Sequence, residues 1–403
     1  MTPGTKPTPA GEKVPLNADE VARQSLATGA VGPALLAVER AWTGCGDWTT
    51  AQARLRQVAT GNVDADDDTG LYYGVPAVAF LLQAAADRHP RLRAASQTMD
   101  EHVLRLTRRR LVSAASRIDR GQPAAFAEYD LFNGLTGIGA LLLRHHSRSD
   151  ELAGILRYVV TLVTRPRHED GAELPGWWVA HDPDKIMPTP GGHANFGMAH
   201  GTAGLLSFLA LATVDGRMVD GQREAIAELT RWFDRWRQDG PDGPWWPQWI
   251  TRDELRAGRL ARTRPGRPSW CYGTVGIARA LQLAALATDE PQRQHAAETA
   301  LAASLTDTQL NRITEPGLCH GVAGIYQTVY RASLDAHDPG LADRLPALTK
   351  RLIRHAPPDV GQNNNQAGAP GLLTGHAGLE LALETARRGT PPHTGWDACL
   401  LIT

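Results

Sequence analysis

The chain has 403 residues, of which 42% are hydrophobic, and its formal net charge is −1 at pH 7. This length allows one large domain or two ordinary ones with a sizeable core. The balanced charge gives no electrostatic reason to expect nucleic acid or an acidic membrane surface as a partner. The longest apolar run, around residues 205–214, is too short to span a bilayer, which needs about 20 residues.

The first ten residues are polar and rich in proline. Because they lack the apolar core of a signal peptide, we expect residues 1–16 to form a disordered lead-in and residues 17–403 to form one domain. Such a protein is expected in the cytoplasm, where cysteines stay reduced and are free to bind metal. The chain has four of them, Cys45, Cys271, Cys319 and Cys399.

Helical spacing of apolar residues begins at residues 18–27 and 31–42, and Ala, Leu and Arg are more frequent than alternating β-branched residues. A motif of the type Gly-x-x-Gly then recurs, each time followed by an apolar run of helical character. Its first glycines are Gly74, Gly134, Gly201, Gly273, Gly321 and Gly375. The first copy departs from the pattern, with Pro76 and Ala77 near the position of the second glycine.

The helices expected between these motifs are more charged and amphipathic, as in residues 101–117, 222–237 and 341–354. Alternation of apolar and amphipathic helices predicts an all-α fold, an α/α toroid of six or seven helical hairpins with inner and outer rings. The seventh hairpin would be the N-terminal pair. An open α-solenoid is the competing architecture, but the variable repeat lengths and the lack of evident capping repeats favour closure.

Two of the glycine motifs carry soft metal ligands. Cys271 lies two residues before Gly273, and Cys319 and His320 lie directly before Gly321. In a toroid these positions converge at one end of the central axis. Two thiolates and an imidazole suit zinc, and three protein ligands leave one position open, which is typical of a catalytic site. We therefore expect one Zn²⁺ per chain, bound by these three residues.

Other features of the sequence have plain structural interpretations. The glycines allow tight turns and close helix packing without any chemistry. Cys45 and Cys399, which lie outside the motifs, are expected to be small buried hydrophobic residues. Two long spacers, residues 165–194 and 239–268, are rich in Trp and Pro. Their tryptophans either cover the ends of the helix ring or form the walls of a peptide cleft.

The combination of Trp270-Cys-Tyr-Gly273, Cys319-His-Gly321 and Ala199-His-Gly-Thr-Ala-Gly204 on this repeating frame resembles the lanthionine synthetase C-like family. The resemblance runs from about Ala18 to the C-terminus, and the length is similar to that of stand-alone cyclases of class I lanthipeptide pathways. It implies an α/α toroid with a catalytic zinc. By this resemblance the zinc ligands would be Cys271, Cys319 and His320.

The resemblance also implies an activity, the addition of peptide cysteine thiols to dehydroalanine or dehydrobutyrine with formation of (methyl)lanthionine rings. Zinc would deprotonate the thiol. His200 would protonate the resulting enolate, with Asp130 fixing its tautomer. Arg267 would stabilise the enolate or hold Asp130, and Tyr272 would donate a hydrogen bond to the metal-bound thiolate. A helix cap at His200 and an Asx turn at Asp130 are the structural alternatives.

The implied substrate is a dehydrated precursor peptide, and the implied partners are a lanthipeptide dehydratase and an exporter, through which the protein would be peripheral at the membrane. Two alternatives remain open, namely zinc-dependent addition of glutathione or another thiol to dehydroamino acids, and a non-catalytic peptide-binding toroid with structural zinc. Protein prenyltransferases lack the Gly-x-x-Gly register, and a toroidal glycosidase needs paired inward carboxylates.

Overall fold

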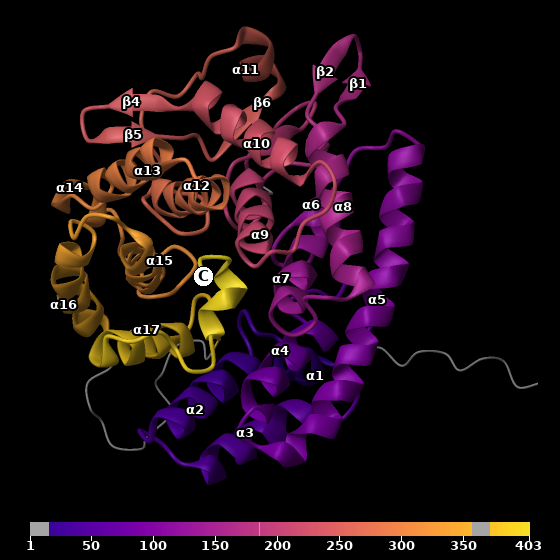
Figure 1. Cartoon of the computed structure of the whole chain (residues 1–403), viewed down its shortest axis with the longest axis vertical. Coiled ribbons are helices and arrows are strands. Elements are labelled where there is room, and N and C mark those ends of the chain that lie inside the picture. The colour runs from indigo at the N-terminus through magenta and orange to yellow at the C-terminus, as the bar shows by residue number, and fades with distance from the viewer. Residues whose placement is uncertain (1–15, 185, 357–370) are drawn as a thin grey trace, which may run out of the picture.

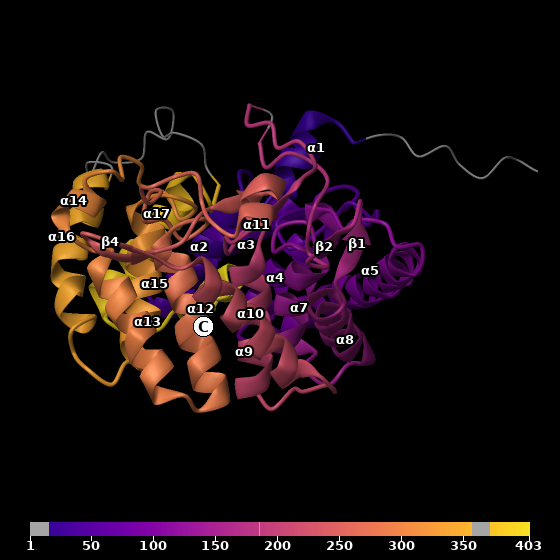
Figure 2. The ribbon, with the colours of Figure 1, turned by 90° about the horizontal axis from the view of Figure 1, so that it is seen from above.

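Two concentric rings of helices make up most of the protein (Figure 1). The structure is a computed structural model that describes residues 16–184, 186–356 and 371–403. The arrangement confirms the predicted α/α toroid. Seen from the side, the inner helix α12 and the outer helix α13 run side by side in nearly the same direction (Figure 2). The expected disordered lead-in, residues 1–16, lies outside the described residues except for Leu16.

Within the described residues, seven helices form the inner ring. They are α2 (Val31–Thr43), α4 (Val75–Ala86), α7 (Leu135–His145), α9 (Thr202–Val214), α12 (Thr274–Thr288), α15 (Val322–Asp335) and α17 (His376–Arg388). Each contacts the next one, and α17 contacts α2, so the ring is closed and the open solenoid is excluded. All of them except α2 begin directly after the first glycine of a repeat motif, as the sequence predicted.

The outer ring consists of amphipathic helices. They are α3 (Trp48–Ala59), α5 (Arg93–Asp119), α8 (Asp150–Thr164), α10 (Gln222–Trp236), α13 (Pro291–Ala303) and α16 (Leu345–His355). Helix α10 buries Ala225, Ile226, Leu229 and Phe233 at helical spacing, whereas α9 buries every residue from Thr202 to Ala212. The difference arises because an inner helix is covered on all sides and an outer helix on one. An N-terminal hairpin is present, but it is formed by α2 and α3, whereas residues 18–27 contribute only the short helix α1 (Ala18–Arg23).

The connections contain shorter elements. The helices are α1 (Ala18–Arg23), α6 (Phe126–Tyr129), α11 (Arg252–Ala257) and α14 (Asp307–Leu310), with 3₁₀ turns at η1 (Pro90–Leu92), η2 (Ala342–Arg344) and η3 (Trp396–Leu400). No helix in the described parts of the chain has the length and apolar character needed to cross a membrane.

Six short strands occur in the two Trp- and Pro-rich spacers of the described chain, and the sequence did not predict them. They form three antiparallel pairs, β1 (Arg167–Glu169) with β2 (Ala172–Leu174), β3 (His193–Asn195) with β6 (Trp249–Thr251), and β4 (Gln238–Gly240) with β5 (Gly243–Trp245). Trp177, Trp178, Trp245 and Trp246 are buried. Their burial supports the structural interpretation of these tryptophans.

Backbone hydrogen bonds join the loops that precede the inner helices into a closed belt. The amide of Cys271 donates to the carbonyl oxygen of Cys319 at 3.2 Å, and the amide of Cys319 donates to that of Leu373 at 2.9 Å. The remaining links run from Leu373 to Ala27, Leu26 to Tyr72, Tyr72 to Phe132, Leu131 to Ala199 and Ala199 to Cys271. The belt therefore makes Cys271 and Cys319 neighbours, although they belong to different repeats.

The end of the chain fills the middle of the ring (Figure 1). Residues 394–402, which we call the C-terminal segment, include η3, and their large apolar side chains are buried. Cys399 is buried as predicted. The same prediction for Cys45 is wrong, because Gly44 ends α2 in the left-handed conformation and leaves Cys45 exposed in the following turn.

Candidate metal centre and its acid–base pair

Cys271, Cys319 and His320 lie together at the loops that begin α12 and α15. Their potential ligand atoms are all within 4.8 Å of one another. Cys271 is 2% exposed, and the belt bond between the two cysteines fixes the distance between their loops. The structure thus brings together the three residues that the motifs singled out. Two thiols and an imidazole, held close together with one thiol buried and the other two groups partly exposed, fit a soft divalent cation such as zinc.

The electrostatics of this cluster favour a thiolate at Cys271. A hydrogen bond from Cys319 is the largest effect that lowers the pKa of Cys271, and His320 and Ser269 act in the same direction against the effect of burial, so that the pKa is about 5. The pKa of Cys319 is raised, because its thiol bonds to Cys271 and is itself buried. The pKa of His320 is also raised, chiefly by Cys271. The site is therefore prepared to hold positive charge.

A carboxylate that was not predicted from the sequence lies beside the imidazole of His320. The Nε2 atom of His320 is 2.6 Å from Oε2 of Glu315, which leaves Nδ1 as the ring nitrogen for a metal. Glu315 precedes Cys319 by four residues, and this local acidic residue was the available signal.

Arg267 lies next to the same carboxylate, with its Nη1 atom 3.5 Å from Oε1 of Glu315 and its side chain 46% exposed. The hydrogen bonds of the Asp130 carboxylate run instead to the amides of Asn133 and Gly134 and to His200. The structure therefore places Arg267 at the rim of the metal centre, paired with Glu315 and not with Asp130.

Asp130 and His200 form a tight pair between the loop before α7 and the loop before α9. The Nδ1 atom of His200 is 2.5 Å from Oδ2 of Asp130, whose side chain is fully buried. Oδ1 of Asp130 accepts hydrogen bonds from the amides of Asn133 at 2.7 Å and Gly134 at 2.8 Å. Asp130 thus makes the turn that the structural interpretation required and also orients the imidazole. Because Nδ1 faces the carboxylate, Nε2 is the nitrogen left to exchange a proton.

Aromatic rings hold His200 beside the metal cluster. Phe126 stacks on its imidazole with ring centroids 5.0 Å apart, and Phe132 meets it edge-on at 4.8 Å. Tyr272, which follows the ligand Cys271, lies on another side at 6.0 Å. Burial is the largest cause that raises the pKa of Tyr272, and the charges of Cys271 and Cys319 add to it. The Tyr272 phenol therefore stays protonated and remains a hydrogen-bond donor.

His193 lies on the far side of Phe126, behind this pair. It is fully buried, and its Nδ1 atom is 3.0 Å from the carbonyl oxygen of His181, while Nε2 has no hydrogen-bond partner. Burial lowers the pKa of His193 to about 4. This neutral histidine packs edge-on against Phe126, with ring centroids 5.4 Å apart, and so helps to support the ring that stacks on His200.

Comparisons with known proteins agree with this picture. In curated sequences, the nisin biosynthesis protein NisC of Lactococcus lactis subsp. lactis is 25% identical over 206 residues, which are 50% of this chain and 48% of NisC. The alignment therefore spans about half of that relative. In solved structures, a nisin cyclase has a TM-score of 0.79 at 18% identity and covers 95% of this chain and 93% of its own, which shows a shared fold. The family model described as lanthionine synthetase C-like protein matches residues 20–401, and the chain belongs to this family.

Proposed function

We propose that this protein is a zinc-dependent lanthipeptide cyclase, which forms lanthionine or methyllanthionine rings in a dehydrated peptide. The observation that carries the proposal is the placement of two functional groups in adjacent loops. The ligand set Cys271, Cys319 and His320 is linked to the His200–Asp130 pair by the hydrogen bond from the amide of Ala199 to the carbonyl of Cys271, 3.3 Å long. A thiol activator beside a proton donor is what addition to a dehydroamino acid requires.

The proposed reaction needs a thiolate nucleophile and a proton at carbon. Zinc held by the three residues would supply the first by lowering the pKa of a substrate cysteine at its open position. The sulfur then bonds to the β-carbon of the dehydroamino acid, and the alkene electron pair moves to give an enolate. His200 donates its Nε2 proton to the α-carbon, and Asp130 stabilises the imidazolium before that transfer.

The neighbouring residues have supporting roles in this proposal. Tyr272, which stays protonated, donates a hydrogen bond toward the reacting sulfur. Glu315 orients His320 and is itself held by Arg267. In this arrangement Arg267 acts on the metal centre indirectly, because it holds Glu315. Its side chain is 46% exposed, so the guanidinium can also bind the enolate or the peptide backbone.

Likeness to a nisin biosynthesis protein and a nisin cyclase supports the choice of substrate class. By that likeness, the substrate is a precursor peptide whose serines or threonines have been dehydrated. A lanthipeptide dehydratase would supply it, and an exporter would receive the product. The proposed location is the cytoplasm, with attachment to the membrane through this complex.

Synthetic peptides that contain one dehydroalanine and one cysteine at several spacings, incubated with glutathione present, test the activity. Ring closure leaves the mass unchanged and protects the cysteine from alkylation, whereas addition of glutathione raises the mass of the peptide. We expect protection with zinc-loaded wild type and with Cys45→Ala, whose cysteine is exposed outside the metal centre, but not with Cys319→Ala. A mass increase would favour the glutathione alternative, and neither change in any peptide would favour a binding protein.

Metal content separates a catalytic from a structural site. We expect about one zinc per chain in the wild type and in Cys45→Ala, and none in a Cys271→Ala, Cys319→Ala double variant, with helical circular dichroism retained in all three. The rings are held by helix contacts, so helicity does not require the metal. Loss of helicity in the double variant would instead indicate structural zinc.

A further inference from the structure

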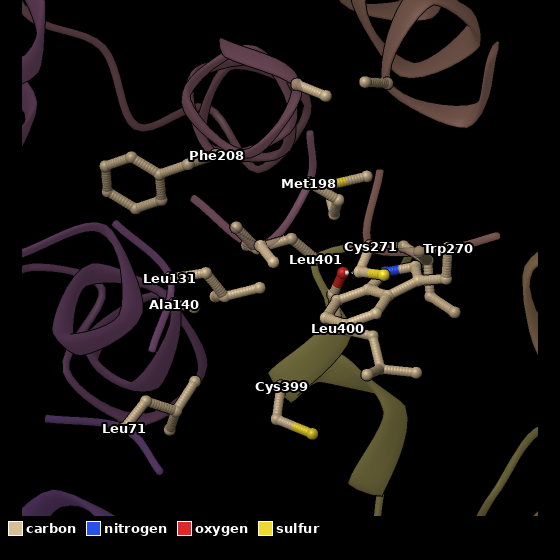
Figure 3. Close-up of a cluster of buried hydrophobic side chains, with 14 of the residues drawn as sticks. Leu71, Leu131, Ala140, Met198, Phe208, Trp270, Cys271, Cys399, Leu400 and Leu401 are labelled. Atoms are coloured by element: carbon tan, nitrogen blue, oxygen red, sulfur yellow. Dashed lines mark hydrogen bonds between the residues drawn. The ribbon is translucent and has the colours of Figure 1, made fainter. Parts of the chain in front are cut away.

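The C-terminal segment reaches the metal centre from inside the ring. Figure 3 shows Cys399, Leu400 and Leu401 of this segment in one cluster with Trp270 and Cys271. These five residues are buried, with at most 2% of any of them exposed. The C-terminal segment, which follows the last inner helix, thus packs against the loop that carries Cys271.

Two residues of the belt loops donate side-chain hydrogen bonds to the C-terminal segment. The indole Nε1 of Trp270, directly before Cys271, donates to the carbonyl oxygen of Leu400 at 3.0 Å. The hydroxyl of Tyr72 donates to the carbonyl oxygen of Cys399 at 2.8 Å. Burial raises the pKa of Tyr72, so its proton is retained. Both acceptors are main-chain carbonyl oxygens, so their positions are set by the path of the C-terminal segment.

Charged side chains from several inner helices fix the segment itself. Arg331 of α15 makes two bonds of 2.6 and 2.8 Å to the buried carboxylate of Asp397. Arg279 of α12, whose side chain is 1% exposed, donates twice to the carbonyl of Ile402. Glu39 of α2 accepts two bonds from Thr394. Charge-assisted bonds to a buried chain are strong, so the carbonyl of Leu400 is a fixed reference point.

Trp270 is also constrained from the side of α12. A Cβ atom at Gly276 would come within 2.0 Å of the carbonyl oxygen of Trp270, which shows how closely the first turn of α12 approaches this residue. The contact of its backbone with α12 and the hydrogen bond of its indole to Leu400 together restrict the position of Trp270. Because Cys271 is the next residue, its backbone is restricted as well.

We propose that the C-terminal segment is a positioning element for the metal centre, and that Trp270 is the residue through which it orients Cys271. The proposal rests on the metal centre of the proposed function. It gives the hydrogen bond between Trp270 and Leu400 a role beyond stability, because a ligand that can move binds its metal more weakly.

Replacing the indole by a benzene ring tests this role. Trp270→Phe keeps an aromatic ring and loses the hydrogen bond to Leu400. Trp246→Phe is the matched control, since the buried indole of Trp246 also donates to a main-chain carbonyl, that of Phe233, at 2.8 Å in the outer layer. Zinc affinity is measured by competition with a chromogenic chelator, and ligand geometry by the visible spectrum of the cobalt-substituted protein.

We expect Trp270→Phe to bind zinc about 10- to 100-fold more weakly than Trp246→Phe and to show a changed cobalt spectrum. Equal affinities and spectra in the two variants would overturn the inference and leave the proposed function intact. If Trp270→Phe fails to fold, Tyr72→Phe, which loses one hydroxyl, decides by the same comparison. A wild type that binds no zinc would overturn the proposed function, and the inference with it.

Discussion

The amide of Cys271 donates a hydrogen bond to the carbonyl oxygen of Cys319, and this bond joins the two proposed thiol ligands through the main chain. The ligands belong to different repeats, yet each occupies the same place in its own loop, two residues before the first glycine. The geometry of the site is therefore a product of ring closure, so the cost of bringing the ligands together falls on folding and not on metal binding.

Asp130 has two tasks, and two substitutions should separate them. In Asp130→Asn an oxygen still accepts from Asn133 and Gly134, but the new amide faces His200 and disfavours the Nδ1–H tautomer. We expect near-normal stability and at least about 100-fold slower ring closure. Asp130→Ala should in addition lower the unfolding free energy by about 1–3 kcal/mol, because two amides lose their acceptor. Denaturant unfolding and the cyclisation assay measure the two effects; equal stability losses would contradict the turn role.

His193 should make the protein less stable in mild acid. Burial lowers its pKa to about 4, against an ordinary value of 6.5 in the unfolded chain. The unfolded state therefore takes up a proton first as the pH falls, and the unfolding free energy decreases between pH 6.5 and about 4. The loss reaches about 3 kcal/mol. In His193→Asn, whose amide can still donate to the carbonyl of His181, denaturant unfolding at pH 7.5 and 5 should show a smaller difference than in wild type.

Glu315 should control metal affinity from outside the ligand set. Glu315→Gln removes the charge beside Nε2 of His320, and we expect about 10-fold weaker zinc binding in chelator competition. Glu290→Gln is the control, since Glu290 makes a surface ion pair with Arg293 away from the site. The same affinity in both variants would show that the pair of Glu315 with His320 is incidental.

The ion pair between Arg331 and Asp397 should be important for stability. Asp397 has no exposed side-chain surface, and Asp397→Ala leaves the guanidinium without its partner. We expect the unfolding free energy to fall by about 3–5 kcal/mol. Asp253→Ala, which breaks an exposed pair with Arg256, should cost less than about 1 kcal/mol. Urea unfolding of both variants is the measurement, and similar midpoints would argue that the C-terminal segment is loosely held.

The sequence was sufficient to predict those features that repeat. Apolar runs after Gly201 and Gly273 predicted the inner helices, and the common register of Cys271 and Cys319 predicted that these side chains lie close together. Features that depend on contacts between repeats were not predictable from local pattern. Nothing near Arg267 indicates that its partner is Glu315 from the next loop, because both residues lie in irregular segments whose path is set by the belt.

The short strands and the position of the C-terminal segment inside the ring were not predicted, for a similar physical reason. Three-residue strands such as β3 have too few residues for an alternating pattern, and they pair with segments far along the chain. The burial of Trp396 to Ile402 comes from the ring around them, and their own sequence is too short to indicate an environment.

Closure of the ring also constrains the order in which the protein can fold. Helix α2, near the start of the chain, finds its second neighbour in α17, and the segment that fills the interior follows α17. During synthesis the first hairpins therefore expose the apolar face of α2, and the centre of the ring stays unfilled, until α17 and the C-terminal segment have been made. Folding is then expected to finish in one cooperative step and not repeat by repeat as in a linear array. A chaperone that shields the edge of α2 would act in this interval.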